Sequence, residues 1–262
     1  MESTLSAATS SSETSGLGAP GVVVAIVVDR PTSTLEGVLA AVVAQDYPNI
    51  QVLVLLTGSG DDEYALVNDI AQTTFATTNF PQPHIYQLGA NPGFGLAANT
   101  ALRLVEGDSG FFLVMHDDVV LAPDSVRILV EELYRSNAGM VGPKFVEWEE
   151  TRRLQAVGFD CDWFGELDSD VEPHELDQEQ HDAVRDVFVL PSACFLIRAD
   201  LFRELGGFEP TIEFFGEDLD LCWRAHKSGA RVVVVPAATV RHQAAMMARL
   251  RSCSFFCSSD VG

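Results

Sequence analysis

The sequence predicts an α/β protein with a doubly wound sheet. Strand-like and helix-like segments alternate along the first half of the chain, which is the signature of a doubly wound fold. The strand-like segments are short apolar runs rich in β-branched residues, as expected for parallel strands that are buried on both faces. The 262 residues are enough for one large domain or two small ones.

The first strand and helix set the pattern for this half of the chain. Residues 22–28 are apolar at every position, which indicates a buried strand. Residues 34–45 carry apolar side chains at helical spacing, and the Asp-Tyr-Pro-Asn sequence at 46–49 ends that helix. The alternation continues with a strand at 50–56, a helix at 62–76, a strand at 84–88, a helix that ends near 105 and a strand at 111–115.

The regular alternation of strand-like and helix-like segments ends in the second half of the chain. The segment 147–186 is strongly acidic, with eleven Asp or Glu residues and one Arg at 160–186. We interpret this segment as a solvated loop region with a short hairpin. The alternative is a flap that faces the substrate. The other predicted elements are a helix at 123–136, a strand at 141–146, a strand pair or one long strand broken at Pro191 over 187–197, helices at 199–205 and 218–228, and a strand at 231–235.

The two ends of the chain differ from the middle. Residues 1–20 are mostly Ser, Thr, Ala and Gly and are interpreted as a disordered leader. We expect one ordered domain at 21–243 and an irregular, truncated tail at 244–262, with a short helix at 244–250. A missing C-terminal part would leave room for membrane association, although no apolar run is long enough for a transmembrane helix.

The charge balance limits the partners. Asp and Glu number 38 against 16 Lys and Arg, giving a net charge of −22. Such a surface repels nucleic-acid phosphates and anionic lipid headgroups, so we expect no nucleic-acid partner. The five cysteines include no CxxC pair, and Cys194 and Cys222 are expected to be reduced core residues. A cytoplasmic location follows, at the inner face of the membrane if a further part anchors the chain.

The first candidate site is His116-Asp117-Asp118, directly after the predicted strand at 111–115. Ligands of open α/β sheets bind beyond the carboxyl ends of the strands. Adjacent carboxylates and an imidazole suit a divalent cation that also holds substrate phosphates. The alternative is a helix cap or a surface cluster of acids.

A second acidic group stands at the start of the predicted helix 218–228. Glu217, Asp218 and Asp220 crowd its first turn, where the helix dipole favours negative charge. They could therefore simply cap the helix. Two phenylalanines at 214–215 indicate that this end is buried, and a carboxylate in such surroundings can act as a general base. Asp220 and Arg224 are spaced to form an ion pair.

The third candidate is the turn at 93–99, which reads G-x-G-x-x-A-N. Glycine-rich turns that enter a helix bring backbone N–H groups close to anions. The spacing also matches a dinucleotide-binding fingerprint, which makes an NAD-dependent Rossmann-type oxidoreductase one alternative function. Its position argues against this, because the fingerprint belongs after the first strand of the fold, and here that strand ends in Asp29 with no glycine.

Taken together, these segments resemble family 2 glycosyltransferases, and especially the bacterial rhamnosyl- and galactofuranosyl-transferase branch. The resemblance covers about residues 21–243. It rests on the order of six segments: LAAVVAQDYPN at 39–49, NPGFGLAAN at 91–99, MHDDVVL at 115–121, GGF at 206–208, FGEDLDLCWR at 215–224 and the stretch 236–242. It implies the GT-A fold, a doubly wound mixed sheet flanked by helices.

The resemblance also implies roles for individual residues. Asp118 matches the last acid of the family's metal-binding DxD-type motif, and His242 matches the histidine that completes the metal site. His116 stands where the family often has Asp or Asn, and we include it with the expected ligands of Mn²⁺ or Mg²⁺. Asp218 matches the base that deprotonates the acceptor hydroxyl, with Glu217 in support.

The implied function is the inverting transfer of a sugar from a nucleotide diphosphate to a hydroxyl of a glycan or lipid-linked acceptor. The expected contacts of the nucleotide sugar are Asp29, Asn91, Gly93, Gly95, Asn99 and Asp117. Many members of the family read the base with an acid after the second strand, where this chain has Leu56. UDP- and dTDP-sugars therefore both stay open as donors. A non-catalytic relative that only binds the sugar nucleotide is the remaining alternative.

Overall fold

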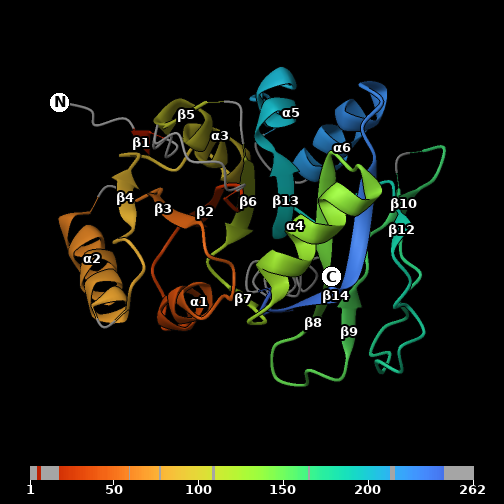
Figure 1. Ribbon diagram of the computed structural model, residues 1–262, viewed down its shortest axis with the longest axis horizontal. Helices are drawn as coiled ribbons and strands as arrows, with labels where there is room; N and C mark the ends of the chain where they lie inside the picture. The colour runs from red at the N-terminus through yellow and green to blue at the C-terminus, as the bar shows by residue number, and fades with distance from the viewer. Residues whose placement is uncertain are drawn as a thin grey trace, which may run out of the picture.

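A computed structural model describes residues 5–6, 18–58, 60–76, 78–107, 110–164, 166–212 and 216–244. A mixed sheet lies between two layers of helices (Figure 1). The helices are α1 (Thr34–Val43), α2 (Asp61–Phe75), α3 (Phe94–Leu104), α4 (Ser125–Ser136), α5 (Ala199–Glu204) and α6 (Glu217–Lys227).

The order of the strands in the main sheet is β12-β14-β8-β13-β6-β2-β3-β4, with β7 paired to β14 and β9 paired to β8. These strands are β2 (Val22–Val28), β3 (Ile50–Leu56), β4 (His84–Gln87), β6 (Phe111–His116), β7 (Val119–Leu121), β8 (Met140–Glu147), β9 (Leu154–Ala156), β12 (Arg185–Asp186), β13 (Cys194–Arg198) and β14 (Val232–His242). Strands β4, β3, β2 and β6 run parallel, and β13 is antiparallel to β6 and β8. The carboxyl ends of the parallel strands therefore meet at one edge of the sheet.

The alternation of side chains along β2 explains why a strand that is apolar throughout is needed here. Val24 and Ile26 face one core with α1, α2 and α4, while Ala25 and Val27 face the other core with α3, α5 and α6. Successive residues of a strand point to opposite faces. A sheet with helices on both sides thus has no polar face, as the sequence predicted.

Strand β14 is longer than the strand predicted at 231–235. It continues through Pro236 to His242, and its register with β8 shifts between Val235 and Thr239. Proline lacks the N–H that a regular ladder needs, and an irregularity tolerates this loss. The prediction stopped at the proline, so it missed both the second half of β14 and the short strand β7 that pairs with it.

The prediction for 187–197 was only partly right. Only Cys194–Arg198 form a strand, β13. Val187 and Val189 are buried in the core on the α6 side, but they form no extended ladder, and Val189 makes a single bridge with Phe159. The apolar pattern there reflects packing, and Pro191 separates it from the strand.

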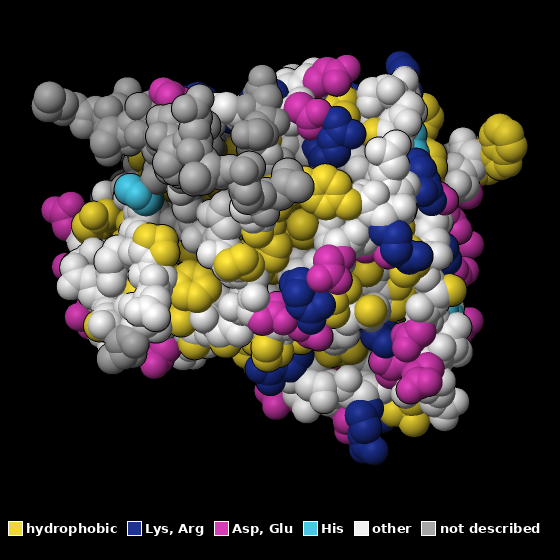
Figure 2. Space-filling view, viewed as in Figure 1, with side chains coloured by type: hydrophobic (Ala, Val, Ile, Leu, Met, Phe, Trp, Pro, Cys, Tyr) yellow, Lys and Arg dark blue, Asp and Glu magenta, His cyan; other side chains and the backbone are white. Residues whose placement is uncertain are grey.

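The acidic segment contains the predicted short hairpin, formed by β10 (Asp160–Cys161) and β11 (Leu167–Asp168). Lys144, which is buried on β8, holds the segment against the sheet through Asp177 and Asp182, each 2.7 Å from its Nζ. Over the described part of the face in Figure 2, acidic side chains are scattered rather than gathered in one patch.

The ends of the chain lie mostly outside the described residues. Within the expected leader, β1 (Leu5–Ser6) pairs with β5 (Val105–Glu106). The expected tail beyond residue 244, its short helix and the phenylalanines at 214–215 are not among the described residues. No helix in the described part of the chain is long and apolar enough to span a bilayer. Cys194 and Cys222 are buried free thiols, as predicted.

Candidate active site

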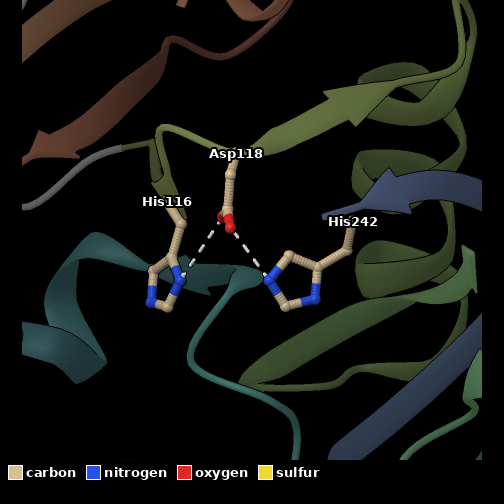
Figure 3. Close-up of side chains that lie close together, drawn as sticks. All are labelled: His116, Asp118 and His242. Carbon is tan, nitrogen blue, oxygen red and sulfur yellow. Dashed lines mark ion pairs between the residues drawn. The ribbon is translucent and has the colours of Figure 1, made fainter. Parts of the chain in front are cut away.

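Three side chains converge where β6 ends (Figure 3). The chain leaves β6 at His116, turns at Asp118 and enters β7, whose Val119 pairs with His242 at the end of β14. The N–H of Gln243 donates to the carbonyl of Asp118 at 3.1 Å. Asp118 Oδ1 consequently lies 3.5 Å from His242 Nε2 and 3.8 Å from His116 Nδ1.

Burial determines the charge of His116 in this cluster. Its imidazole packs edge-on against Phe94, with ring centroids 4.4 Å apart. Burial lowers the pKa of His116 to about 4, outweighing the carboxylate of Asp118, which raises it, while His242 lowers it further. His116 is therefore neutral at pH 7, and its Nε2 is buried with no hydrogen-bond partner among the described residues.

The cluster fits a divalent cation. One donor atom from each of His116, Asp118 and His242 lies within 4.8 Å of the other two. Neutral imidazole nitrogens and a carboxylate oxygen are the usual donors for such ions, and a cation would also relieve the close approach of these electron-rich atoms. Two nitrogen donors favour Mn²⁺ over Mg²⁺, because Mg²⁺ prefers oxygen ligands.

Gln155 holds the side chain and the backbone of His242. Its Nδ1 lies 2.8 Å from Oε1 of Gln155 on β9, and the amide of Gln155 also reaches the carbonyl of His242 at 3.4 Å. Sequence reasoning missed Gln155, because it belongs to no motif and lies in the acidic segment.

The expected base stands at the start of α6. Asp218 Oδ1 accepts from the N–H of Leu219 at 2.8 Å, and its Oδ2 accepts from the N–H of Ser192 at 3.4 Å. The hydroxyl of Ser192 donates to Glu217 at 3.0 Å. Burial, and then the charge of Glu217, raise the pKa of Asp218, while the backbone N–H donors lower it.

The backbone of Ser192 and Ala193 connects Asp218 to the cation cluster. Ser192 precedes Ala193, whose carbonyl accepts from the N–H of His116 at 3.0 Å. One short stretch of chain therefore contacts the base on one side and the cluster on the other. Sequence reasoning missed Ser192, because a serine before a strand carries no specific signal.

Asp220, two residues after Asp218 on α6, forms an ion pair with Arg224. Its Oδ2 accepts from Nε of Arg224 at 2.8 Å, and Nη1 of Arg224 donates to the carbonyl of Leu205 at 2.8 Å. The ion pair predicted from the spacing is confirmed. It ties α6 to the chain after α5.

A hollow lies at the carboxyl ends of β2 and β3, lined by Asp29, Thr57 and Asn91 among others. Asp29 Oδ1 accepts from the amide of Asn91 at 2.6 Å and from the hydroxyl of Thr57 at 3.2 Å. Leu56 is completely buried, so its side chain cannot read a base. Thr57, which sequence reasoning missed, is the first polar residue after β3.

The glycine-rich turn joins this hollow to the cation cluster. Asn91 Oδ1 accepts from the N–H of Gly93 at 2.8 Å. Gly93 has a φ of 90°, which favours glycine, and it precedes the first turn of α3. Phe94, the first residue of α3, contacts His116. The N-terminus of α3 thus lies beside the cluster, where its free N–H groups favour an anion.

Gly95 and Asn99 pack against Phe208 instead. A Cβ on Gly95 would lie 2.9 Å from Cβ of Phe208. The amide of Asn99 donates to the carbonyl of Phe208 and its oxygen accepts from the N–H of Phe208, both at 2.8 Å. Both polar groups of Asn99 therefore bind the GGF segment, and the contact of Gly95 and Asn99 with the nucleotide sugar stays a prediction. Of Asp117, the structure shows its carbonyl accepting from Thr34 at 3.3 Å.

Comparison with known families gives one match that covers most of the chain. The model of the family described as "Glycosyltransferase like family 2" matches residues 20–253. A pre-mycofactocin glycosyltransferase of Mycobacterium tuberculosis is 30% identical over 154 residues, which cover 57% of this chain and 30% of that protein. An N-acetylglucosaminyl-diphospho-decaprenol L-rhamnosyltransferase of the same species is 28% identical over 234 residues, covering 82% and 73%. The chain thus spans less than a third of the first relative and most of the second.

Solved structures share the fold at low sequence identity. GalNAc-T7, crystallised with UDP, GalNAc and Mn²⁺, superposes with a TM-score of 0.69 at 14% identity, over 87% of this chain and 44% of that one. TarS of S. aureus gives a TM-score of 0.62 at 15% identity, over 85% and 36%.

Proposed function

The chain belongs to glycosyltransferase-like family 2 and has the GT-A fold, and from this premise we propose that it moves a sugar from a nucleotide diphosphate to an acceptor hydroxyl, with a divalent cation and with inversion. The observation that carries the proposal is the meeting of His116, Asp118 and His242 at one edge of the sheet, between the hollow at Asp29 and the carboxylate of Asp218.

The cation would be held by His116, Asp118 and His242. When bound there it neutralises the charge of the donor diphosphate and of the nucleotide that leaves. The N-terminus of α3 adds backbone N–H groups on the same side. This pairing explains how a chain with a net charge of −22 holds an anionic donor.

The nucleoside would occupy the hollow lined by Asp29, Thr57 and Asn91. Hydrogen bonds already connect these side chains, so the wall of the hollow is ordered before a ligand arrives. Gly93 and Asp117 complete the proposed donor contacts. Because Leu56 is buried, the base is read by other groups, and we keep both UDP- and dTDP-sugars as donors.

Asp218 would take the proton of the acceptor hydroxyl. The freed electron pair of that oxygen forms a bond to the anomeric carbon, while the bond from this carbon to the diphosphate oxygen breaks and its electrons leave with the nucleotide. One displacement of this kind inverts the configuration. A raised pKa suits Asp218 to this task, because it makes the carboxylate a stronger base than an ordinary aspartate.

The acceptor would be a glycan or a lipid-linked sugar. The support is the similarity to a protein named as a rhamnosyltransferase that acts on a diphospho-decaprenol-linked sugar, of which the chain covers 73%.

A donor screen tests the proposal. The purified chain is incubated with a panel of UDP- and dTDP-sugars, Mn²⁺ and lipid-linked or glycan acceptors, and release of the nucleotide diphosphate is measured together with the mass of the product. We expect one donor to give acceptor-dependent release. If every donor gives the same release with the Asp218→Asn variant as with the unchanged chain, the proposal is wrong.

The oxidoreductase alternative is overturned by the family match. The structure supplies the physical reason: the glycine-rich turn follows β4 at the margin of the sheet rather than the first strand, β2, and Gly95 makes room for Phe208. The family and its named relatives are transferases, so the non-catalytic alternative is not retained.

A further inference from the structure

We propose that Gln155 is a positioning residue that fixes the tautomer and the ring orientation of His242, so that Nε2 is the nitrogen offered to the cation. This inference rests on the proposed function, because it assigns a role within the proposed cation site. It concerns a residue outside every motif of the sequence.

Two contacts fix the orientation of the Gln155 side chain. Its amide nitrogen lies 3.4 Å from the carbonyl oxygen of His242, and its Oε1 lies 2.8 Å from Nδ1 of the same residue. A carbonyl oxygen can only accept, so the NH₂ group must face it. Oε1 therefore faces the ring, and Nδ1 must carry the proton that is donated to it.

The tautomer of His242 follows from this arrangement. The imidazole form that can bind a cation has a single N–H, and the contact with Gln155 sets it at Nδ1. The lone pair is then at Nε2, which lies 3.5 Å from Asp118 Oδ1 inside the cluster. A ligating histidine usually donates its other N–H to a neighbouring acceptor, which sets the ring for the metal.

The scaffold around Gln155 keeps it in place. Gln155 is the middle residue of β9, and its neighbours Leu154 and Ala156 are buried. β9 pairs with β8, where Phe145 packs edge-on against the ring of His242 with centroids 5.7 Å apart. The ring is thus held by a packed aromatic side chain, and Gln155 decides which nitrogen faces Asp118.

The test compares Gln155→Leu with Gln155→Glu in the full chain. Leucine removes both contacts at similar volume, whereas glutamate keeps an acceptor for Nδ1. Mn²⁺ binding without donor is measured by titration calorimetry, and the tautomer of His242 is read by ¹⁵N NMR of the cation-free protein. Gln51→Leu on β3 is the matched control, because it removes a partly buried glutamine from a strand without touching the cluster.

We expect Gln155→Leu to weaken Mn²⁺ binding by about 10-fold or more, the scale on which such outer partners act, and to lose the uniform Nδ1–H tautomer. Gln155→Glu should restore both properties in large part, and Gln51→Leu should change neither. Thermal melts identify a variant that has lost its fold, and Gln155→Ala, which also removes both contacts, then replaces the leucine variant in the comparison.

Wild-type affinity and an unchanged Nδ1–H signal in folded Gln155→Leu would overturn the inference. If the unchanged chain binds no Mn²⁺, the cation dependence of the proposed function is wrong. The NMR comparison still decides whether Gln155 fixes the ring, so the two failures can be told apart.

Discussion

Nε2 of His242 lies 3.5 Å from Oδ1 of Asp118, although the two residues come from opposite halves of the chain. Antiparallel pairing of β7 with β14 brings them together, since Val119 faces His242 in the ladder. Strand β14 reaches His242 by continuing past Pro236, where its register with β8 shifts between Val235 and Thr239. The candidate cation site thus depends on a strand that the sequence did not predict.

The first prediction is that nucleotide binding requires the cation. UDP or dTDP should stabilise the chain only with Mn²⁺ or Mg²⁺, because the acidic site alone repels a diphosphate. At 100 times the dissociation constant a ligand adds about 2.7 kcal/mol, which for a domain of this size raises Tm by roughly 5–10 °C. A thermal-shift assay with and without EDTA measures this. Equal stabilisation in EDTA would argue against the cation-bridged donor.

The second prediction concerns the choice of metal. Two imidazole nitrogens should make Mn²⁺ a better activator than Mg²⁺. His116→Asp replaces one nitrogen donor with oxygen, so the rate with Mg²⁺ relative to that with Mn²⁺ should rise severalfold. His116→Asn separates the effect of the donor atom from that of the added charge. The measurement is the initial transfer rate at saturating concentrations of each metal. An unchanged ratio in both variants would mean that His116 does not bind the ion.

The third prediction is a shift in pH dependence. Protonated Asp218 cannot accept a proton, so the rate should fall as the pH decreases through its raised pKa. Glu217→Gln removes the neighbouring negative charge that helps to raise this pKa, while its amide oxygen can still accept from Ser192. The acid limb of kcat/KM should therefore move to lower pH in this variant. The profile is measured at saturating Mn²⁺, and an acid limb that stays in place would show that Asp218 is not the group that titrates.

Strands β2, β3 and β6 of the parallel half could be predicted because nearly every residue of each is buried, and burial on both faces leaves an apolar run in the sequence. The bounds of β2 and β3 agree with the prediction. The pairing of Asp220 with Arg224 could also be predicted, because it depends only on helical spacing.

The contacts that complete the site could not be predicted in the same way. Gln155, Ser192 and Thr57 act through hydrogen bonds to groups that are distant in the sequence. Such contacts leave no periodic pattern in the sequence, because their partners are not near one another along the chain. Asn99 shows the same limit: its place in a glycine-rich turn suggested a contact with the nucleotide sugar, and the structure adds that its amide is hydrogen-bonded to the backbone of Phe208. Position in a motif does not reveal what a side chain faces.

The last prediction separates the two neighbouring acids of α6. Asp218→Asn keeps the shape of the side chain and removes its basicity, so sugar transfer should fall by about 10²-fold or more, the usual scale for a general base. The affinity for the nucleotide should hardly change, because Asp218 contacts Ser192 and Leu219 and not the proposed donor hollow. Transfer rates and nucleotide titrations on the same preparation give both values.

Asp220→Asn is the control for this experiment, because it stands two positions further along α6 and pairs with Arg224. It should retain near-normal transfer and lose only the contribution of a helical ion pair, about 0.3–0.5 kcal/mol, which denaturant unfolding can measure. If Asp218→Asn kept near-normal turnover while Asp220→Asn abolished it, the base would be Asp220. In that case the carboxylate beside Arg224 would have to leave its ion pair to reach the acceptor, and the contact between α6 and Leu205 would have to loosen during each turnover.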